Sequence, residues 1–207
     1  VLRQAFPDLT VDSMKETALS GMYEVVSGQN VFYFFPEKEY LFIGEIYTKD
    51  RKPLSAGRKK ELRENTIRLV KTLPLEKAVK IGVGRSTVIE FTDPDCSYCR
   101  KASDFFKKRK DVTRYVFFAP IAHPQAITKI HHILSSKDKA SAYEDMMSGK
   151  ESPKGAVYSE AIKSLAQEHL ALARKVGVHG TPTFFVDGQE VVGADERKIE
   201  SILNSHK

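Results

Sequence analysis

The stretch Phe91-Thr92-Asp93-Pro94-Asp95-Cys96-Ser97-Tyr98-Cys99-Arg100-Lys101 decides the fold of this chain. It holds both cysteines of the 207-residue sequence, separated by two residues. The apolar run 87–92 before them predicts a buried strand, and the run 100–110 after them predicts a helix. A strand that delivers a Cys-x-x-Cys pair to the start of a helix is typical of a thiol–disulfide redox site.

The two cysteines are predicted to take different roles. Cys96 falls in the first turn of the predicted helix 96–110, where unpaired backbone N–H groups and the helix dipole stabilise an anion. Arg100 and Lys101 add positive charge within one turn, so Cys96 is predicted to be the attacking thiolate. Cys99 is expected to be less exposed and to resolve a mixed disulfide.

Other uses of two cysteines are weaker hypotheses. A single pair cannot form a framework of structural disulfides, and it supplies only half of a four-ligand zinc site. A c-type haem attachment needs a histidine directly after the second cysteine, where this chain has Arg100. The sequence therefore predicts redox chemistry that uses no metal and no cofactor.

Two further positions are candidate members of the site. Thr181-Pro182 precedes a predicted strand, at the place where a cis proline would face the cysteines and leave backbone groups free to pair with an extended peptide. The Thr181 hydroxyl could contact the sulfur. Glu90 lies in an otherwise apolar strand six residues before Cys96, and a desolvated carboxylate there could accept the proton of Cys99. The alternative for Glu90 is an edge position that reaches solvent.

Composition limits the possible partners and the compartment. The net charge is +6, but the 33 basic residues are scattered among 27 acidic ones, which predicts a solvated surface and no nucleic-acid partner. The longest apolar runs fall far short of the roughly 20 residues that span a bilayer. The first residues lack a charged-then-apolar leader, so we expect a signal peptide to have been removed.

The first quarter of the chain predicts a small antiparallel sheet. After a short helical or irregular lead-in over 1–20, strands are expected at 22–27, 31–36 and 40–48. Such a meander buries too little apolar area to be stable alone. Its many aromatic residues therefore predict a dimer or substrate surface, with a simple core as the alternative. A helix at 58–73 follows and ends at Pro74.

The rest of the chain predicts an α/β domain. A strand 113–120 follows the Cys-x-x-Cys helix, then a helical stretch over about 123–175, strands at 183–186 and 189–192, and a last helix at 195–205. This is the thioredoxin-like order enlarged by a helical insertion. The predicted organisation is thus an α+β N-terminal dimerisation domain (1–57), a linker helix (58–80) and an α/β thioredoxin-like catalytic domain (81–207).

The chain resembles the bacterial periplasmic thiol:disulfide interchange proteins of the DsbC/DsbG family over nearly its whole length. The resemblance rests on the Cys-x-x-Cys stretch, the proline loop and two helical segments, with the N-terminal meander and the linker helix in support. The matching stretches are 91–101, Gly177-Val178-His179-Gly180-Thr181-Pro182-Thr183, Ser136-Lys137-Asp138-Lys139-Ala140 and Met146-Met147-Ser148-Gly149-Lys150.

This resemblance implies a set of functional properties. Members of the family form V-shaped homodimers through their N-terminal domains, and two thioredoxin-like domains face a cleft that holds misfolded or cysteine-containing secreted proteins. They act as periplasmic disulfide isomerases or reductases with chaperone-like binding. A membrane reductase of the DsbD type keeps their cysteines reduced.

Two departures leave alternatives open. DsbC carries a second, structural disulfide in its catalytic domain, whereas this chain has Leu134, Ser135 and Ser136 in the corresponding region. A carboxylate at the position of Glu90 is more typical of the oxidase DsbA and of thioredoxin. A DsbA-like dithiol oxidase, or a protein that acts mainly as a holdase chaperone, therefore remains an alternative to the isomerase.

Overall fold

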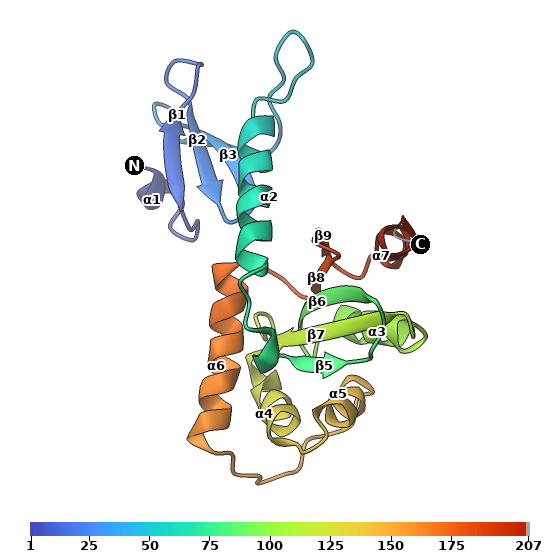
Figure 1. Cartoon of the computed structure of the whole chain (residues 1–207). Coiled ribbons are helices and arrows are strands. Elements are labelled where there is room, and N and C mark those ends of the chain that lie inside the picture. Colours follow the sequence, from blue (N-terminus) through green and yellow to red (C-terminus); the bar gives the residue numbers. More distant parts are fainter. Residues whose placement is uncertain (206–207) are drawn as a thin grey trace. The chain divides into compact units, whose positions relative to one another are not determined.

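A computed structural model describes residues 1–205. The chain divides into two compact units, residues 1–68 and 69–207, and each is described by itself (Figure 1). The predicted linker segment 58–80 falls partly in each unit. The finer domain boundaries therefore stay a prediction.

The first unit is built on a four-stranded antiparallel sheet. Its strands follow chain order, β1-β2-β3-β4, with bounds Ser13–Glu16, Tyr23–Ser27, Asn30–Phe35 and Tyr40–Phe42. The short helix α1 (Leu2–Ala5) contributes Leu2 to a small core with Val25 and Phe34. Val25 of β2 and Phe34 of β3 lie on the face of the sheet that contacts this core, whereas Val26, Val31 and Tyr33 are buried on the opposite face.

Two expectations for this unit are wrong in detail. Ser13–Glu16 is a strand that the sequence does not signal, because three of its four residues are exposed and it is held by pairing with the edge of β2. The predicted strand 40–48 ends at Phe42. The chain then folds back on itself, since Leu54 N–H donates to the Ile46 carbonyl at 2.7 Å, and Glu45 accepts from Ser55 and Lys59.

The second unit contains a five-stranded sheet in the order β5-β7-β6-β8-β9. The central strand β6 pairs parallel with β7, and the other pairings are antiparallel. The predicted hairpin strands β8 and β9 are found at their predicted positions, whereas the short edge strand β5 was not predicted. The bounds are Val79–Ile81 (β5), Ser86–Thr92 (β6), Val112–Phe118 (β7), Thr183–Val186 (β8) and Gln189–Val192 (β9).

Helices cover both faces of this sheet (Figure 1). One face packs Val88 and Phe184 against α3 and α7, and the other packs Phe91 and Phe117 against α6. Helices α4 and α5 extend the core around the two cysteines. No helix in the described part of the chain is long and apolar enough to cross a membrane. The helix bounds are Ala56–Val70 (α2), Ser97–Lys107 (α3), Ile127–Ser135 (α4), Lys139–Met147 (α5), Glu160–Lys175 (α6) and Glu196–Ser205 (α7), with 3₁₀ turns at Leu75–Lys77 and Pro124–Ala126.

A fully buried histidine joins α6 to β7 and to the 3₁₀ turn that leads into β5. His169 Nδ1 accepts from the Phe118 N–H at 3.2 Å, so Nε2 carries the proton and donates to the Lys77 carbonyl at 3.0 Å. An ion pair of 2.5 Å between Lys77 and Glu168 reinforces the junction. Burial lowers the pKa of His169 to about 4, although the hydrogen bond to Lys77 opposes this shift.

This histidine predicts a loss of stability in mild acid. The unfolded chain binds a proton at His169 below about pH 6.5, and the folded chain only below about pH 4. Stability from the neutral ring is therefore complete above pH 6.5 and falls by about 3 kcal/mol as the pH drops to 4. Urea unfolding at pH 7, 5.5 and 4.5 measures it. His169→Gln should have a lower free energy of unfolding at pH 7, and that free energy should depend less on pH. If it still falls with pH as steeply as in the wild type, the assignment to His169 is contradicted.

Candidate active site

The turn between β6 and α3 places Cys96 at the N-cap of α3. Its N–H donates to the Asp93 carbonyl at 3.1 Å, and its own carbonyl accepts from the Arg100 N–H at 3.1 Å, so the helix begins at this residue. The Sγ atom lies 3.5 Å from the Thr181 carbonyl oxygen. Cys96 is 7% exposed as a residue.

Cys99 lies one turn further along α3 and is fully buried. Burial raises the pKa of its thiol far above the usual range, and the neighbouring Cys96 raises it further. The Thr92 side chain and the Asp93 backbone oppose this shift. Both cysteines are buried, and Cys99 is the less exposed of the two, as predicted, at 0% against 7% for Cys96.

The loop before β8 faces the first cysteine. The Thr181–Pro182 peptide bond is cis, as predicted from the sequence. Pro182 is buried, and its carbonyl accepts from the Gly193 N–H at 2.8 Å, which ties the loop to the end of β9. Thr181 contacts Cys96 through its carbonyl oxygen, whereas a contact from its hydroxyl was predicted.

Glu90 is fully buried in the middle of β6, so the alternative of an edge position in solvent is wrong. Its carboxylate pairs with Arg114 at 3.1 Å and accepts from the Tyr143 hydroxyl at 3.1 Å. Arg114 Nη2 also donates to the Tyr143 oxygen at 2.6 Å. The structure thus brings together Cys96, Cys99 and Thr181. It places Glu90 in a separate buried polar group with Arg114 and Tyr143.

A second group of charges holds the turn that precedes Cys96. The buried Asp93 carboxylate accepts from the Asp95 N–H at 2.9 Å and lies 2.9 Å from His123 Nδ1. Asp95 in turn accepts from Lys129 at 2.8 Å, and Arg100 Nε donates to the Pro94 carbonyl at 2.8 Å. These bonds connect α4 and the loop before it to the start of α3, so they hold the backbone turn that leads into Cys96.

Sequence patterns gave only part of this environment. Asp93-Pro94-Asp95 is recognisable turn chemistry before a helix. His123, Lys129, Arg114 and Tyr143 reach the site from distant parts of the chain, and no local pattern marks them. An arginine inside the apolar run of β7 is the one signal that a buried partner for Glu90 existed.

An apolar cavity of about 520 Å³ lies beside the proline loop. Val178 and His179 form one wall, directly before Thr181, and the loop after β7 forms another. Arg174 supplies a charge within this lining. The lining residues are Pro120, Ile121, Pro124, Ile127, Leu170, Arg174, Val178 and His179.

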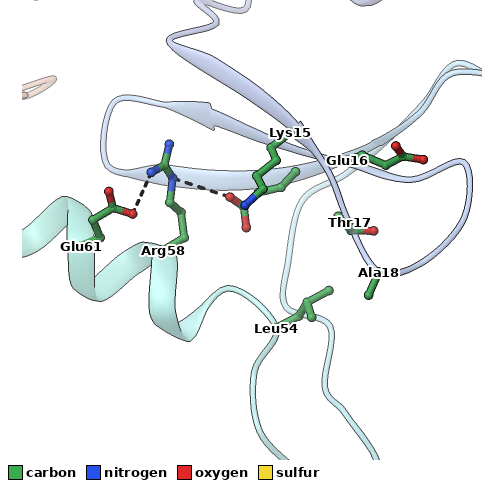
Figure 2. Close-up of a pocket in the computed structure, with 8 residues that line it drawn as sticks. Lys15, Glu16, Thr17, Ala18, Leu54, Arg58 and Glu61 are labelled. Carbon is green, nitrogen blue, oxygen red and sulfur yellow. Dashed lines mark hydrogen bonds and ion pairs between the residues drawn. The ribbon is translucent and has the colours of Figure 1, made fainter.

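A smaller cavity of about 320 Å³ belongs to the first unit (Figure 2). Arg58 lies between two carboxylates there, 2.8 Å from Glu61 and 3.6 Å from Glu24. Arg58 also donates to the Ser13 hydroxyl at 2.8 Å. Its charges are thus largely paired with each other, and we assign no chemistry to this cavity.

Comparison with known families identifies both parts of the chain. Residues 73–205 match the thioredoxin-like domain, and residues 1–56 match the N-terminal domain of disulfide bond isomerase proteins. The chain belongs to the DsbC family of thioredoxin-like proteins. The predicted fold class, a small antiparallel sheet followed by a helix and a thioredoxin-like domain, is thereby confirmed.

Relatives of this DsbC-family chain include a probable thiol:disulfide interchange protein DsbC from Bordetella avium, 30% identical over 91% of the chain and 66% of the relative. The DsbC of Salmonella typhimurium is 26% identical over 100% of the chain and 87% of the relative. The chain thus spans about two thirds of the length of the Bordetella relative. A disulfide interchange protein from Neisseria gonorrhoeae has a solved structure that matches with a TM-score of 0.57 and 32% identity, over 64% of this chain and 97% of that one.

Proposed function

We propose that the chain is a protein disulfide isomerase that also acts as a reductase. One observation carries the proposal: Cys96 starts α3 in contact with the proline loop, and the second thiol is buried directly beneath it. A nucleophile at a helix start with a protected partner is suited to attack a disulfide and then to release it. The isomerase-type N-terminal domain supports isomerisation in preference to DsbA-like oxidation.

The chemistry is two successive exchanges. The Cys96 thiolate attacks one sulfur of a wrong substrate disulfide, so a Cys96–substrate disulfide forms and the other substrate sulfur leaves as a thiolate. In isomerisation, that or another substrate thiolate attacks the mixed disulfide and returns Cys96 reduced. In reduction, Cys99 attacks Cys96, the substrate leaves fully reduced, and the protein retains a Cys96–Cys99 disulfide.

Substrate binding is proposed at the loop and the cavity beside it. The backbone of Thr181 lies 3.5 Å from the nucleophile, so an extended peptide that pairs with this loop brings its disulfide to Cys96. The 520 Å³ cavity next to the loop would take an apolar side chain of that peptide. Unfolded secreted proteins expose extended backbone and apolar side chains beside their disulfides, and they are the proposed substrates.

Refolding of a scrambled-disulfide protein tests the function. The chain, kept reduced, should restore activity to the scrambled substrate faster than it oxidises the same substrate in its reduced form. Preferential oxidation would establish the DsbA-like alternative. The Cys96→Ala variant has no exchange activity. If the wild type rescues no scrambled substrate and this variant suppresses aggregation as well as the wild type does, the holdase alternative is favoured.

We also propose a homodimer through the first unit. The edge strand β4 has one unpaired side, and the apolar residues Tyr40, Phe42 and Ile43 are exposed along it, Ile43 by 79%. An exposed apolar edge of this kind is covered in a native assembly. Two copies related by a two-fold axis would pair these edges and cover them.

The dimer predicts a solution mass of about twice 23.3 kDa by light scattering. Phe42→Lys combined with Ile43→Lys should produce a 23.3 kDa monomer, because charges of one sign would then face each other across the axis. Removal of residues 1–57 should have the same effect. Leu19→Glu, at an exposed apolar site away from β4, is the matched control and should stay dimeric. A monomeric wild-type chain would contradict the proposal.

The proposed compartment is the periplasm, after removal of a signal peptide. Isomerisation requires a reduced Cys96 in an oxidising compartment, so a membrane reductase of the DsbD type is the proposed electron donor. Thiol trapping in cells measures this directly. A reduced Cys96–Cys99 pair supports the isomerase, whereas an oxidised pair supports the oxidase.

A further inference from the structure

Lys129 of α4 is a nearly buried lysine that reaches the turn before Cys96. It is 8% exposed, and a lysine is almost never buried to this extent unless its ammonium group is paired. Its Nζ atom lies 2.8 Å from Asp95 Oδ1, although the two residues are 34 positions apart in the chain. The neighbouring Ile130 belongs to the same core cluster as Cys96 and Cys99. A helix that packs against the active site thus brings a positive charge to it.

Asp95 places a carboxylate directly before the nucleophile. Consecutive Cα atoms are about 3.8 Å apart, so the charges of Asp95 and of a Cys96 thiolate cannot lie far from each other. Two like charges close together repel, and the carboxylate also competes with the thiolate for the positive end of the α3 dipole. Asp95 without a partner would therefore oppose the ionisation of Cys96.

Two cations offset the charge of Asp95. Lys129 lies 2.8 Å from Oδ1, and Arg100 Nη2 lies 3.4 Å from the same oxygen. The Arg100 guanidinium also serves the backbone, because its Nε donates to the Pro94 carbonyl at 2.8 Å. The side chain of Lys129 is 10% exposed and that of Arg100 is 35% exposed, so solvent screens Arg100 more strongly. Lys129 is therefore the main counter-charge of Asp95.

Asp93, the other carboxylate of this turn, has a basic partner of its own. It is fully buried, lies 2.9 Å from His123 Nδ1 and accepts from the Asp95 N–H at 2.9 Å. The turn thus receives one basic group for each carboxylate from α4 and the loop before it. Lys129 is the group that pairs with Asp95.

We propose that Lys129 is a positioning residue that acts through Asp95: it offsets this carboxylate, so that the Cys96 thiolate forms at a lower pH than it would beside a lone Asp95 charge. The inference rests on the proposed function only in that Cys96 is the attacking thiol. Isomerisation and reduction both begin with attack by this thiolate. A larger thiolate fraction at neutral pH therefore speeds the first exchange of either reaction.

Other charged or titratable groups around this turn contribute to the pH profile of Cys96. They belong to its own helix and to the elements packed around it. The groups are Asp93, Asp95, Cys99, Arg100, Lys101, His123 of the loop before α4, Lys129 of α4, His179 of the loop before β8, and Glu196 of α7, which lies 3.9 Å from Lys101. Variants that change only Lys129 and Asp95 leave the other groups in place, so differences between their profiles report this pair.

Alkylation of the reduced chain with iodoacetamide measures the ionisation of Cys96. The thiol loses its proton to water, and the thiolate then displaces iodide. A C–S bond forms, the C–I bond breaks, and iodide leaves with the electron pair of that bond. The rate is recorded between about pH 4 and 9, a range that covers both lowered and ordinary thiol pKa values. Tandem mass spectrometry assigns the label to Cys96.

Lys129→Met should move the midpoint of this profile upward by about one pH unit, which slows alkylation about tenfold below the midpoint. At the alkaline plateau the rate should equal that of the wild type, because every Cys96 is then a thiolate. A purely structural role for Lys129 would displace the sulfur and lower the rate at every pH. A lowered plateau with an unchanged midpoint would overturn the proposal.

Asp95→Asn is the reverse change. It removes the carboxylate but keeps an amide oxygen that can accept from Lys129, so the midpoint should move downward by about one unit. The double variant loses one charge of each sign and should return to within about 0.3 unit of the wild type. Shifts in the same direction in both single variants would contradict the charge balance. Lys129→Gln, which keeps an N–H donor for Asp95, replaces Lys129→Met if that variant folds poorly.

Lys107→Met is the matched control. Lys107 lies at the other end of α3, about 16 Å along the helix axis from Cys96, and pairs with Asp104 and Glu144 at 3.1 and 3.2 Å. At about 0.15 M salt its charge is screened over that distance, so the midpoint should stay within about 0.2 unit of the wild type. An equal shift in this variant would indicate a general effect of net charge and refute the role of Lys129. The assay contains no protein disulfide, so its outcome does not depend on whether the chain isomerises disulfides.

Discussion

Replacing Cys96 by Ser is expected to lower the rate of thiol–disulfide exchange by at least about a thousand-fold, since only a thiolate attacks a disulfide. Cys96 starts α3 and contacts the proline loop, whereas Cys99 is fully buried and cannot take over the attack. Reduction of a fluorescent peptide that contains a disulfide bond measures the rate. The thermal midpoint should change little, because serine is close in size and preferred at an N-cap.

Cys99→Ala separates the second step from the first. This variant should still react with substrate, but it should accumulate a Cys96–substrate mixed disulfide that is visible on a non-reducing gel. Isomerase activity should persist in part, because substrate thiols can also attack the adduct. Exchange that survives in Cys96→Ser, or a lack of adduct in Cys99→Ala, would reverse the roles assigned to the two cysteines.

Breaking the buried ion pair is the second large effect. Burial lowers the pKa of Arg114, but Glu90 and the nearby Tyr143 raise it above its usual value, so the guanidinium stays charged in the core. Arg114→Met would leave the Glu90 carboxylate buried with only the Tyr143 hydroxyl as a partner. We expect a loss of about 3–5 kcal/mol in the free energy of unfolding, measured by urea denaturation.

An apolar replacement of the whole group is the matched control. The triple variant Glu90→Leu, Arg114→Met and Tyr143→Phe removes every polar atom of the cluster, so no charge or hydroxyl is left unpaired. Its stability should lie within about 1–2 kcal/mol of the wild type, because burying the pair costs nearly as much as the pair contributes. If Arg114→Met alone were harmless, the pair would be open to water.

The sequence predicted those parts of the site whose neighbours in space are neighbours along the chain. The strand, the Cys-x-x-Cys pair and the helix start are contiguous, and local turn chemistry marks the bend between them. The proline loop was predicted from its place before β8. Tertiary partners had no such signal: Arg114 and Tyr143 lie 24 and 53 residues from Glu90 along the chain.

The fold followed the same division. Strands β8 and β9, with the turn at Asp187-Gly188 between them, were predicted from a strong local pattern. The edge strands β1 and β5 were missed, because each is short and is defined by its pairing with a neighbour. The strand predicted at 40–48 ends early, because the bonds around Glu45 and Ile46 favour a fold back toward α2.

The last feature is the number of thiols in the chain. Helix α4 contributes Ile133 and Leu134 to the core around the active site, and the sequence has no cysteine besides Cys96 and Cys99. The Cys96–Cys99 pair is therefore the single thiol–disulfide couple in this sequence. Labelling of free thiols, or the mass change that labelling produces, measures the oxidised fraction of this pair. The wild-type chain can therefore report the redox potential of the buffer or compartment in which it is equilibrated.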